Sequence, residues 1–223
     1  AYPFSAVLGQ TTLDSGEDKL LSIVPSDALF VLRVNQFETT FNQLDQFLAG
    51  TSPLGLSMLV RMQLAGFLGD PALSNVNMKG NFAVFALENP NPTVEDPMVT
   101  PVALMGCIPI TDAESFVEEN PNCSEPDENG IATITTKDMM GNDVQMLITD
   151  IESYGLVCTK DCYEILSNFR KYFDTESGSG VKFVPIVEVL NDIEVQKAGN
   201  EPIWLYMHLP EVSDPFISSI FSG

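Results

Sequence analysis

The side chains that could do chemistry in this chain are few and unevenly distributed. Among the 223 residues there is one histidine, His208, and there are 31 acidic residues against 10 basic ones. A serine or cysteine nucleophile needs a base such as histidine within hydrogen-bond reach, so catalysis of that kind would have to use His208. Metal sites built from several histidines are excluded as well. The sequence marks no catalytic site, and we expect a protein that is not an enzyme.

The segment from Glu125 to Gly130 is the strongest candidate for metal binding. Glu125, Asp127 and Asn129 alternate oxygen-bearing side chains ahead of a glycine, as in the first half of a calcium-binding loop. The position at which such a loop carries a bidentate glutamate is held by Thr136, however. The segment is either a weak calcium site or a solvated turn leading into the next strand, and no other cofactor is expected.

A second candidate surface follows from the alternation in residues 202–209. Side chains of an extended strand point alternately to its two faces, which places Trp204, Tyr206 and His208 together. This face offers aromatic rings and an imidazole to a small molecule or glycan. Hydrolysis by paired carboxylates is a further alternative, but it needs two acids about 5–10 Å apart in a cleft. Nothing in the sequence indicates such a cleft.

The composition excludes several classes of partner. A formal net charge of −21 and a pI near 4.1 mean that the protein repels nucleic-acid phosphates. Hydrophobic residues make up 44% of the chain, which separates it from disordered acidic tails and predicts a true core. No apolar run approaches the roughly 18 residues that a membrane-spanning helix needs. We expect no nucleic-acid binding and no membrane insertion.

The first residue and the cysteine content both bear on location. The chain begins with Ala1 rather than methionine and contains four cysteines, an even number. An exported protein whose signal peptide has been removed fits these facts, and a trimmed cytosolic chain fits them too. We expect a secreted, cell-surface or periplasmic protein.

The cysteines are candidates for disulfide bonds. They are Cys107, Cys123, Cys158 and Cys162. A helix that returns antiparallel from the strand at 101–108 would bring Cys123 near Cys107, which favours that pairing. Cys158 and Cys162 would then be joined across a tight strand-to-helix turn. Four separate buried thiols remain the alternative, because free cysteine packs like a small hydrophobic residue.

Hydrophobic patterns predict seven strands separated by turns and helices. The strands are expected at residues 28–34, 81–88, 101–108, 131–137, 143–151, 154–160 and 202–209. The fourth, fifth and sixth are joined by short turns and read as an antiparallel meander. Helices are expected after Asn35, over 56–68, after Thr111, after Asp161, over 185–194 and after Ser213. Asn35, with Glu38 three residues later, predicts a capping box at the start of the first of them.

These elements define the expected fold class and its organisation. The class is α+β, an antiparallel sheet with helices packed mainly on one face. An N-terminal arm of residues 1–20 precedes a domain of residues 21–223, which could be two fused halves at about 21–124 and 125–223. The strand and helix at 25–48 are echoed at 102–117 and again from residue 202, so an internal β-α-α-β-β-α-β-β-β-α unit and the start of another are expected.

Part of the chain resembles a known group of proteins. The run Val24-Pro25-Ser26-Asp27-Ala28-Leu29-Phe30-Val31 leads into Asn35-Gln36-Phe37, and Gly80-Asn81-Phe82-Ala83-Val84-Phe85 follows later. Over about the first 110 residues this is similar to uncharacterised exported bacterial proteins, some from planctomycete-type bacteria, that repeat a Pro-x-Asp-Ala strand before a helix. The resemblance implies an extracytoplasmic bacterial protein and carries over no functional residue.

The first nine residues favour one class of function. Tyr2, Pro3, Phe4, Val7 and Leu8 form an apolar segment ahead of a polar stretch, the pattern of an arm that docks on a neighbour. We therefore expect an extracytoplasmic structural or assembly protein, or an accessory subunit, that acts through protein–protein contacts or self-association. A module that binds a glycan, a small molecule or calcium is the first alternative, and a carboxylate-based hydrolase is the second.

Overall fold

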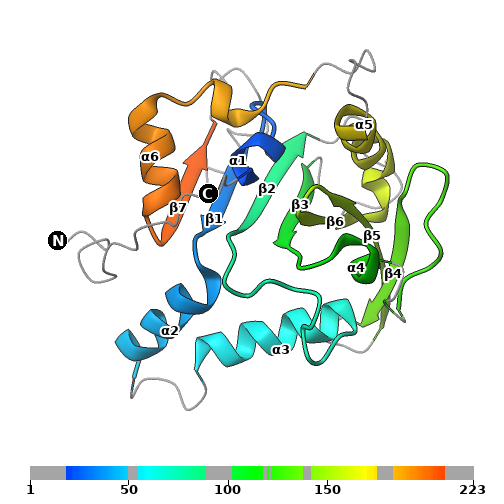
Figure 1. Cartoon of the computed structure of the whole chain (residues 1–223), viewed down its shortest axis with the longest axis horizontal. Coiled ribbons are helices and arrows are strands. Elements are labelled where there is room, and N and C mark those ends of the chain that lie inside the picture. Colours follow the sequence, from blue (N-terminus) through cyan, green and yellow to red (C-terminus); the bar gives the residue numbers. More distant parts are fainter. Residues whose placement is uncertain are drawn as a thin grey trace, which may run out of the picture.

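One antiparallel sheet of seven strands organises the molecule. The computed structural model describes residues 19–49, 55–88, 102–117, 120, 122–137, 142–174 and 183–208. Within them the strand order is β4-β5-β6-β3-β2-β1-β7, and every neighbouring pair is antiparallel. The α+β class is therefore confirmed. Figure 1 shows the open, twisted sheet with helices around it.

The strands agree closely with the sequence pattern. Their bounds are β1 Phe30–Val34, β2 Phe82–Glu88, β3 Val102–Pro109, β4 Ala132–Lys137, β5 Asp143–Ile151, β6 Tyr154–Thr159 and β7 Ile203–Met207. The meander of β4, β5 and β6 is confirmed, and Glu152 takes a left-handed conformation in the turn between the last two. Strands β4 and β7 form the two edges of the sheet.

Six α-helices lie in the described part of the chain. They are α1 Leu20–Ile23, α2 Phe37–Phe47, α3 Leu56–Leu68, α4 Ala113–Val117, α5 Tyr163–Asp174 and α6 Asp192–Asn200, with short 3-10 turns η2 Lys160–Cys162 and η3 Ile186–Glu188. From β1 to α5 the element order is that of the predicted β-α-α-β-β-α-β-β-β-α unit. Residues 1–18 of the predicted arm of residues 1–20, and the closing helix expected after Ser213, lie outside the described residues, whereas Leu20 begins α1.

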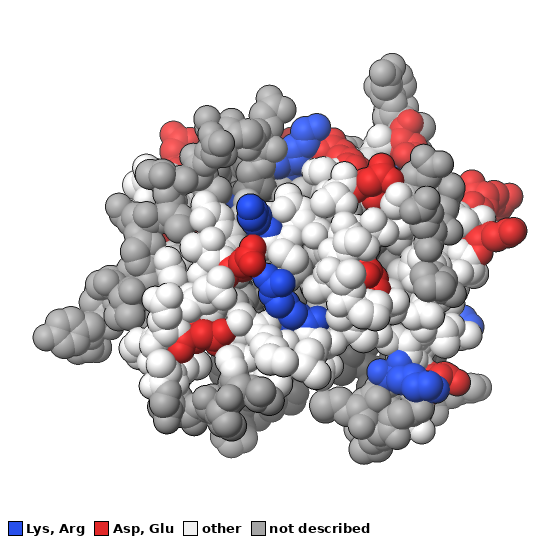
Figure 2. Space-filling model, turned by 60° about the horizontal axis from the view of Figure 1, so that its bottom comes forward, with Lys and Arg blue, Asp and Glu red and all other residues white. Residues whose placement is uncertain are grey.

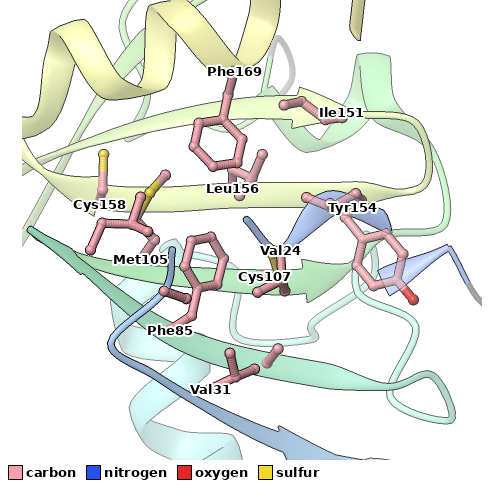
Figure 3. Packing of buried hydrophobic residues seen from close by; sticks show 14 of the residues in the cluster. Val24, Val31, Phe85, Met105, Cys107, Ile151, Tyr154, Leu156, Cys158 and Phe169 are labelled. Atoms are coloured by element: carbon pink, nitrogen blue, oxygen red, sulfur yellow. The ribbon is translucent and has the colours of Figure 1, made fainter. Parts of the chain in front are cut away.

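The first face of the sheet carries the larger hydrophobic core. Val31, Phe85, Met105 and Leu156 are fully buried in it, under α1, α5 and α6. Figure 3 shows Phe169 pointing from α5 toward the strands, where its ring centroid lies 6.2 Å from that of Phe85. The alternation of strand side chains places all these strand residues on one side.

The second face carries a separate core beneath α2, α3 and α4. Phe82, Ile108 and Val157 face Phe37 of α2 and Phe116 of α4. Helices therefore pack against both faces of the sheet rather than mainly against one. Strands from both predicted halves share this one sheet, and the three strands of the first half, β3, β2 and β1, lie between β6 and β7 of the second.

The predicted capping box at the start of α2 is wrong. The Asn35 side chain accepts a hydrogen bond from Arg33 Nε at 2.6 Å and donates to the carbonyls of Ala198 and Glu201. These partners belong to the β1 strand and to the α6 end, so the side chain ties two distant segments together instead of capping a helix. Gln36, with a φ of 45°, is the residue that precedes α2.

Candidate functional site

The aromatic face of β7 is directed into the protein. The rings of Trp204 and Tyr206 are stacked with centroids 5.9 Å apart, and both pack partly buried against the first core. His208 is exposed, and its backbone N–H donates to Leu29 O at 2.9 Å. Trp204 and Tyr206 share one face of β7, as predicted. Much of the surface of these two rings is buried against the first core and is therefore closed to a ligand.

The acidic segment forms a closed turn. Asp127 Oδ1 accepts hydrogen bonds from the backbone N–H groups of Asn129 and Ile131, at 2.9 and 3.0 Å, and Oδ2 accepts one from the hydroxyl of Tyr163. Partial burial opposes ionisation of Asp127, but these donors outweigh it and lower the pKa. Glu125 lies exposed in the same loop. No group of three or more His, Cys, Asp or Glu side chains within the described ranges is arranged to hold a metal.

The cysteines are unpaired, which corrects the expected disulfides. Cys107 is buried in the first core, whereas Cys123 packs against the second core on the opposite face of the sheet. The sheet itself separates these two thiols, because α4 is short and the chain after it runs alongside the outer edge of β4 instead of returning along β3. The alternative of four separate thiols holds, with Cys123 half-buried and the other three buried.

Three of the four thiols are poor nucleophiles. Burial raises the pKa of Cys107 well above its usual range and that of Cys123 to about 11. The hydrogen bond that Cys158 donates to Cys162, together with burial, raises the pKa of Cys158 and lowers that of Cys162. Because the thiolate is the reactive form, the raised pKa values make Cys107, Cys123 and Cys158 unreactive. Cys162 has no exposed surface, so all four cysteines pack as small hydrophobic side chains.

Among the described residues, one cationic side chain is buried in this acidic protein. Arg33 on β1 is 1% exposed, and burial lowers its pKa to about 10. Tyr154 on β6 lies close enough to interact with it electrostatically; burial raises the pKa of this tyrosine to about 12, although Arg33 works in the opposite direction. These groups, with Asn35, link β1 to β6 and α6, and we assign them to the framework.

A cleft of about 810 Å³ opens at one end of the first core. Its apolar lining includes Phe169 and Phe183, whose ring centroids lie 5.3 Å apart. The carboxylates of Asp27 and Glu88 are exposed and also line it. An apolar floor with acidic groups beside it suits an amphipathic molecule that carries a positive charge.

Helix α3 presents the most unusual surface of the described part. Its outward arc carries Met58, Leu59, Met62, Gln63 and Gly66 at helical spacing, and none of them is charged. The side chains of Met58, Leu59 and Met62 remain 52%, 40% and 58% exposed. We call these three residues the α3 stripe. The spacing of Leu56, Leu59, Val60, Leu64 and Phe67 predicts that they share the inner face of the helix, but Leu59 lies on its outer side.

Polar contacts hold the first half of α3 against α2. The carboxylate of Asp45, on α2, accepts hydrogen bonds from the backbone N–H groups of Leu56 and Ser57 and from the Ser57 hydroxyl. These hydrogen bonds, first that of the Ser57 hydroxyl, lower the pKa of Asp45. Arg61 donates to Glu38 at 2.6 Å. The inner side of α3 packs against the second core through Val60, Leu64 and Phe67.

The surroundings of the α3 stripe are poor in charge despite the overall charge of −21. Figure 2 turns the α2 and α3 side forward and shows mostly uncharged surface, broken by a short row of basic and acidic residues, with most acidic residues toward the rim. An uncharged, apolar helix face within an acidic molecule is a surface suited to contact with another protein.

Sequence reasoning missed both the cleft and the α3 stripe as sites. The stripe had a usable signal: residues 56–68 contain apolar side chains on every side of the helix, where a surface helix should be polar on one. No sequence pattern indicated the cleft, because its lining comes from four separate segments of the chain.

Comparisons with known proteins add no assignment. Neither the family models, the curated proteins nor the solved structures that were searched produced a match to this chain. In the part of the chain that the structure describes, no helix is both long and apolar enough to cross a membrane.

Proposed function

We propose that this protein is a non-enzymatic structural or assembly protein that works through protein–protein contacts, with the α3 stripe as its contact surface. The observation that carries the proposal is that α3 has apolar side chains on every side, with Ser57, Arg61 and Gln63 as its polar residues, while Leu68 is its one buried residue. Helices so rich in apolar residues are ordinarily enclosed on most sides. The outward arc of α3 therefore resembles a buried surface in composition, yet Met58, Leu59 and Met62 remain 40–58% exposed.

The residue types in the stripe strengthen this proposal. Methionine is flexible and polarisable, so Met58 and Met62 can adapt to the shape of a partner. Fully burying a leucine or methionine contributes about 1.5–3 kcal/mol, so covering what remains exposed of the three side chains contributes on the order of 2–4 kcal/mol before the entropic cost of association. That is enough for a central contact in a larger interface.

The partner is either a second copy or another protein to which this chain is an accessory subunit. Two copies each carrying a net charge of −21 repel one another, so self-association should strengthen as salt screens that repulsion. A different partner with basic residues around its binding surface would show the opposite dependence. An extracytoplasmic location remains part of the proposal and is supported by the resemblance of the segments at 24–37 and 80–85 to exported bacterial proteins.

The test is sedimentation velocity of the full chain over a range of concentrations and salt. Met62→Asp places a charge in the stripe, and Gln196→Asp adds the same charge at an exposed polar position of α6, away from α3. For self-assembly we expect an associating wild type, a monomeric Met62→Asp variant and an associating Gln196→Asp variant. Association that is equal in all three chains would contradict a role for the stripe, whereas three monomers would leave only the accessory-subunit form.

A second candidate function is supported by the cleft beside Phe169 and Phe183. It is a ligand-binding module, for which the cleft is better formed than the face of Trp204. Thermal shift with a panel of amphipathic amines would test it, with Asp27→Asn as the variant that should bind less well. Absence of any shift across the panel would remove this candidate.

A further inference from the structure

The outer side of α3 changes in size along the helix. Its first half carries the large side chains of the α3 stripe, Met58, Leu59 and Met62, which are 40–58% exposed. Its second half carries Gly66, with the partly buried Ala65 beside it, and a Cβ added at Gly66 would meet nothing within 4 Å. Figure 1 shows α3 along the outer margin of the molecule. The first half of this surface therefore projects, and the second half leaves room.

The large and small residues lie on the same two lines along the helix. Residues seven apart are separated by about two turns, or about 10.5 Å, and point in nearly the same direction. Leu59 is followed two turns later by Gly66, and Met58 is followed in the same way by Ala65. Met62 lies between the large pair and the small pair. A rotation of 180° about an axis beside Met62, perpendicular to the helix, therefore exchanges the large positions with the small ones.

We propose that α3 packs antiparallel against α3 of a second copy of this chain, across a two-fold axis beside Met62. The proposal rests on the proposed function of the α3 stripe and names its partner. Leu59 of each copy then lies over Gly66 of the other, and Met58 lies over Ala65. Large side chains meet small ones along the whole contact, as the close packing of protein interfaces requires. A parallel pair would set large against large and leave a gap beside Gly66.

Gly66 itself supports a close contact at this position. Glycine is unfavourable inside a helix, because it loses more backbone freedom on folding than alanine does. A Cβ at Gly66 has free space around it, so packing within the chain does not account for the glycine. The approach of a second helix does account for it, since a missing side chain lets two backbones come close together.

The charges around α3 agree with an antiparallel second copy. Arg61 is the one charged residue of α3, all of whose residues are described, and it donates to Glu38 of the same chain at 2.6 Å. The large and small halves of the contact are therefore uncharged. An antiparallel arrangement also places the start of each helix beside the end of the other, where the helix dipoles attract. The carboxylates of Asp45 and Asp70 flank the two ends of α3, so salt should strengthen the association.

An exchange of the large and small residues provides the test. Sedimentation velocity of the full chain, over a range of concentrations and salt, compares the wild type with Gly66→Leu, Leu59→Ala and the double variant. Gly66→Leu fills the space that Leu59 of the second copy needs, so it should raise the dissociation constant at least about tenfold. Leu59→Ala should raise it too, because it leaves a gap opposite Gly66. The double variant exchanges the two sizes and should associate within about threefold of the wild type.

A control and a second measurement exclude general effects of the substitutions. Gln196→Leu adds the same side chain at an exposed position of α6 and should leave the association unchanged. Because glycine is unfavourable in a helix, Gly66→Leu should not lower the unfolding temperature of the dilute monomer. Diamide, which takes two electrons and two protons from two thiols as one disulfide forms, gives a test without the exchange. It should join two Met62→Cys chains at least about tenfold faster than two Gln196→Cys chains.

The opposite results would overturn the second-copy contact. Wild-type association in Gly66→Leu, or a double variant that associates no better than Gly66→Leu alone, would show that Leu59 does not lie over Gly66. Equal crosslinking of Met62→Cys and Gln196→Cys would contradict an axis beside Met62. A wild type that is monomeric at every concentration and salt would leave only the accessory-subunit form of the proposed function, whereas association that survives Met62→Asp would contradict the proposed function as well.

Discussion

The two faces of the sheet differ in how completely they are covered. On the first face, Phe85, Met105 and Leu156 have no exposed surface, and helices or turns cover them from β7 to β5. On the second face, the core ends partway along the strands, and α3, one of the helices that cover this core, is itself apolar on its outer side. The first face therefore holds the larger part of the folding core, whereas the outer side of α3 holds apolar surface that is available for binding.

The largest expected difference is between a core residue and a stripe residue. Phe85→Ala should lower the free energy of unfolding by about 3–5 kcal/mol, because it removes a fully buried ring and leaves a cavity. Met62→Ala should change it by about 0.5 kcal/mol or less, since that side chain is mainly exposed. Urea unfolding of the two variants checks this, and similar losses would show that the stripe is part of the folding core.

Two glycine substitutions should have opposite signs. A Cβ at Gly155 on β6 would lie 2.2 Å from Phe116 Cε1, so Gly155→Ala should destabilise by about 1–3 kcal/mol through overpacking under α4. At Gly66, on the outward arc of α3, a Cβ meets nothing within 4 Å. Gly66→Ala should stabilise by about 0.5–1 kcal/mol. A loss at Gly66 in thermal unfolding would mean that something already covers the outer side of α3.

Stability on the first face should depend on alkaline pH through Tyr154. Its pKa in the fold is about 12, against an ordinary value of 10, so the unfolded chain loses this proton first. The contribution is fully present below pH 10 and is lost as the pH rises from 10 to 12. Tyr154→Phe should flatten the decline in the urea midpoint over that interval. An unchanged slope would place the alkaline sensitivity elsewhere.

The attachment of α3 should depend on acid pH through Asp45, with the smallest effect of the set. Hydrogen bonds from Ser57 and Leu56 lower the pKa of Asp45 in the fold, so its contribution is present above the ordinary aspartate pKa and is lost as the pH falls through the folded one. Asp45→Asn should remove that step and increase amide exchange at the start of α3. Unaltered exchange there would show that the inner apolar contacts alone place the helix.

Local sequence patterns predicted the order of helices and strands, but they did not predict hydrogen bonds between segments that are distant in the sequence. Hydrophobic periodicity predicted the strand β5 at 143–151 and the helix α3 at 56–68 with the observed bounds, because this periodicity is a local property of the sequence. Asn35 was misread as a helix cap because its partners, Ala198 and Glu201, lie more than 160 residues away. No local pattern can report a contact of that separation.

The candidate sites also depend on long-range contacts that local sequence patterns do not report. The predicted Cys107–Cys123 pair failed because the face of the sheet to which Cys123 belongs depends on how the chain passes α4. The α3 stripe was present in the sequence as an apolar helix, but which side of α3 faces outward is decided by Asp45 and the packing of Phe67. The calcium site suggested at Glu125, Asp127 and Asn129 stays a prediction.

The most direct test of the account is photo-crosslinking from the α3 stripe in the cell that makes the protein. A photoreactive residue replaces Met62 in the full chain, and the control carries it at Gln196, an exposed position of α6. The account predicts one defined adduct from position 62, either with a second copy or with a single other protein, and none from position 196. Absence of an adduct at position 62, or the same adducts from both positions, would contradict the claim that α3 is covered by a protein partner.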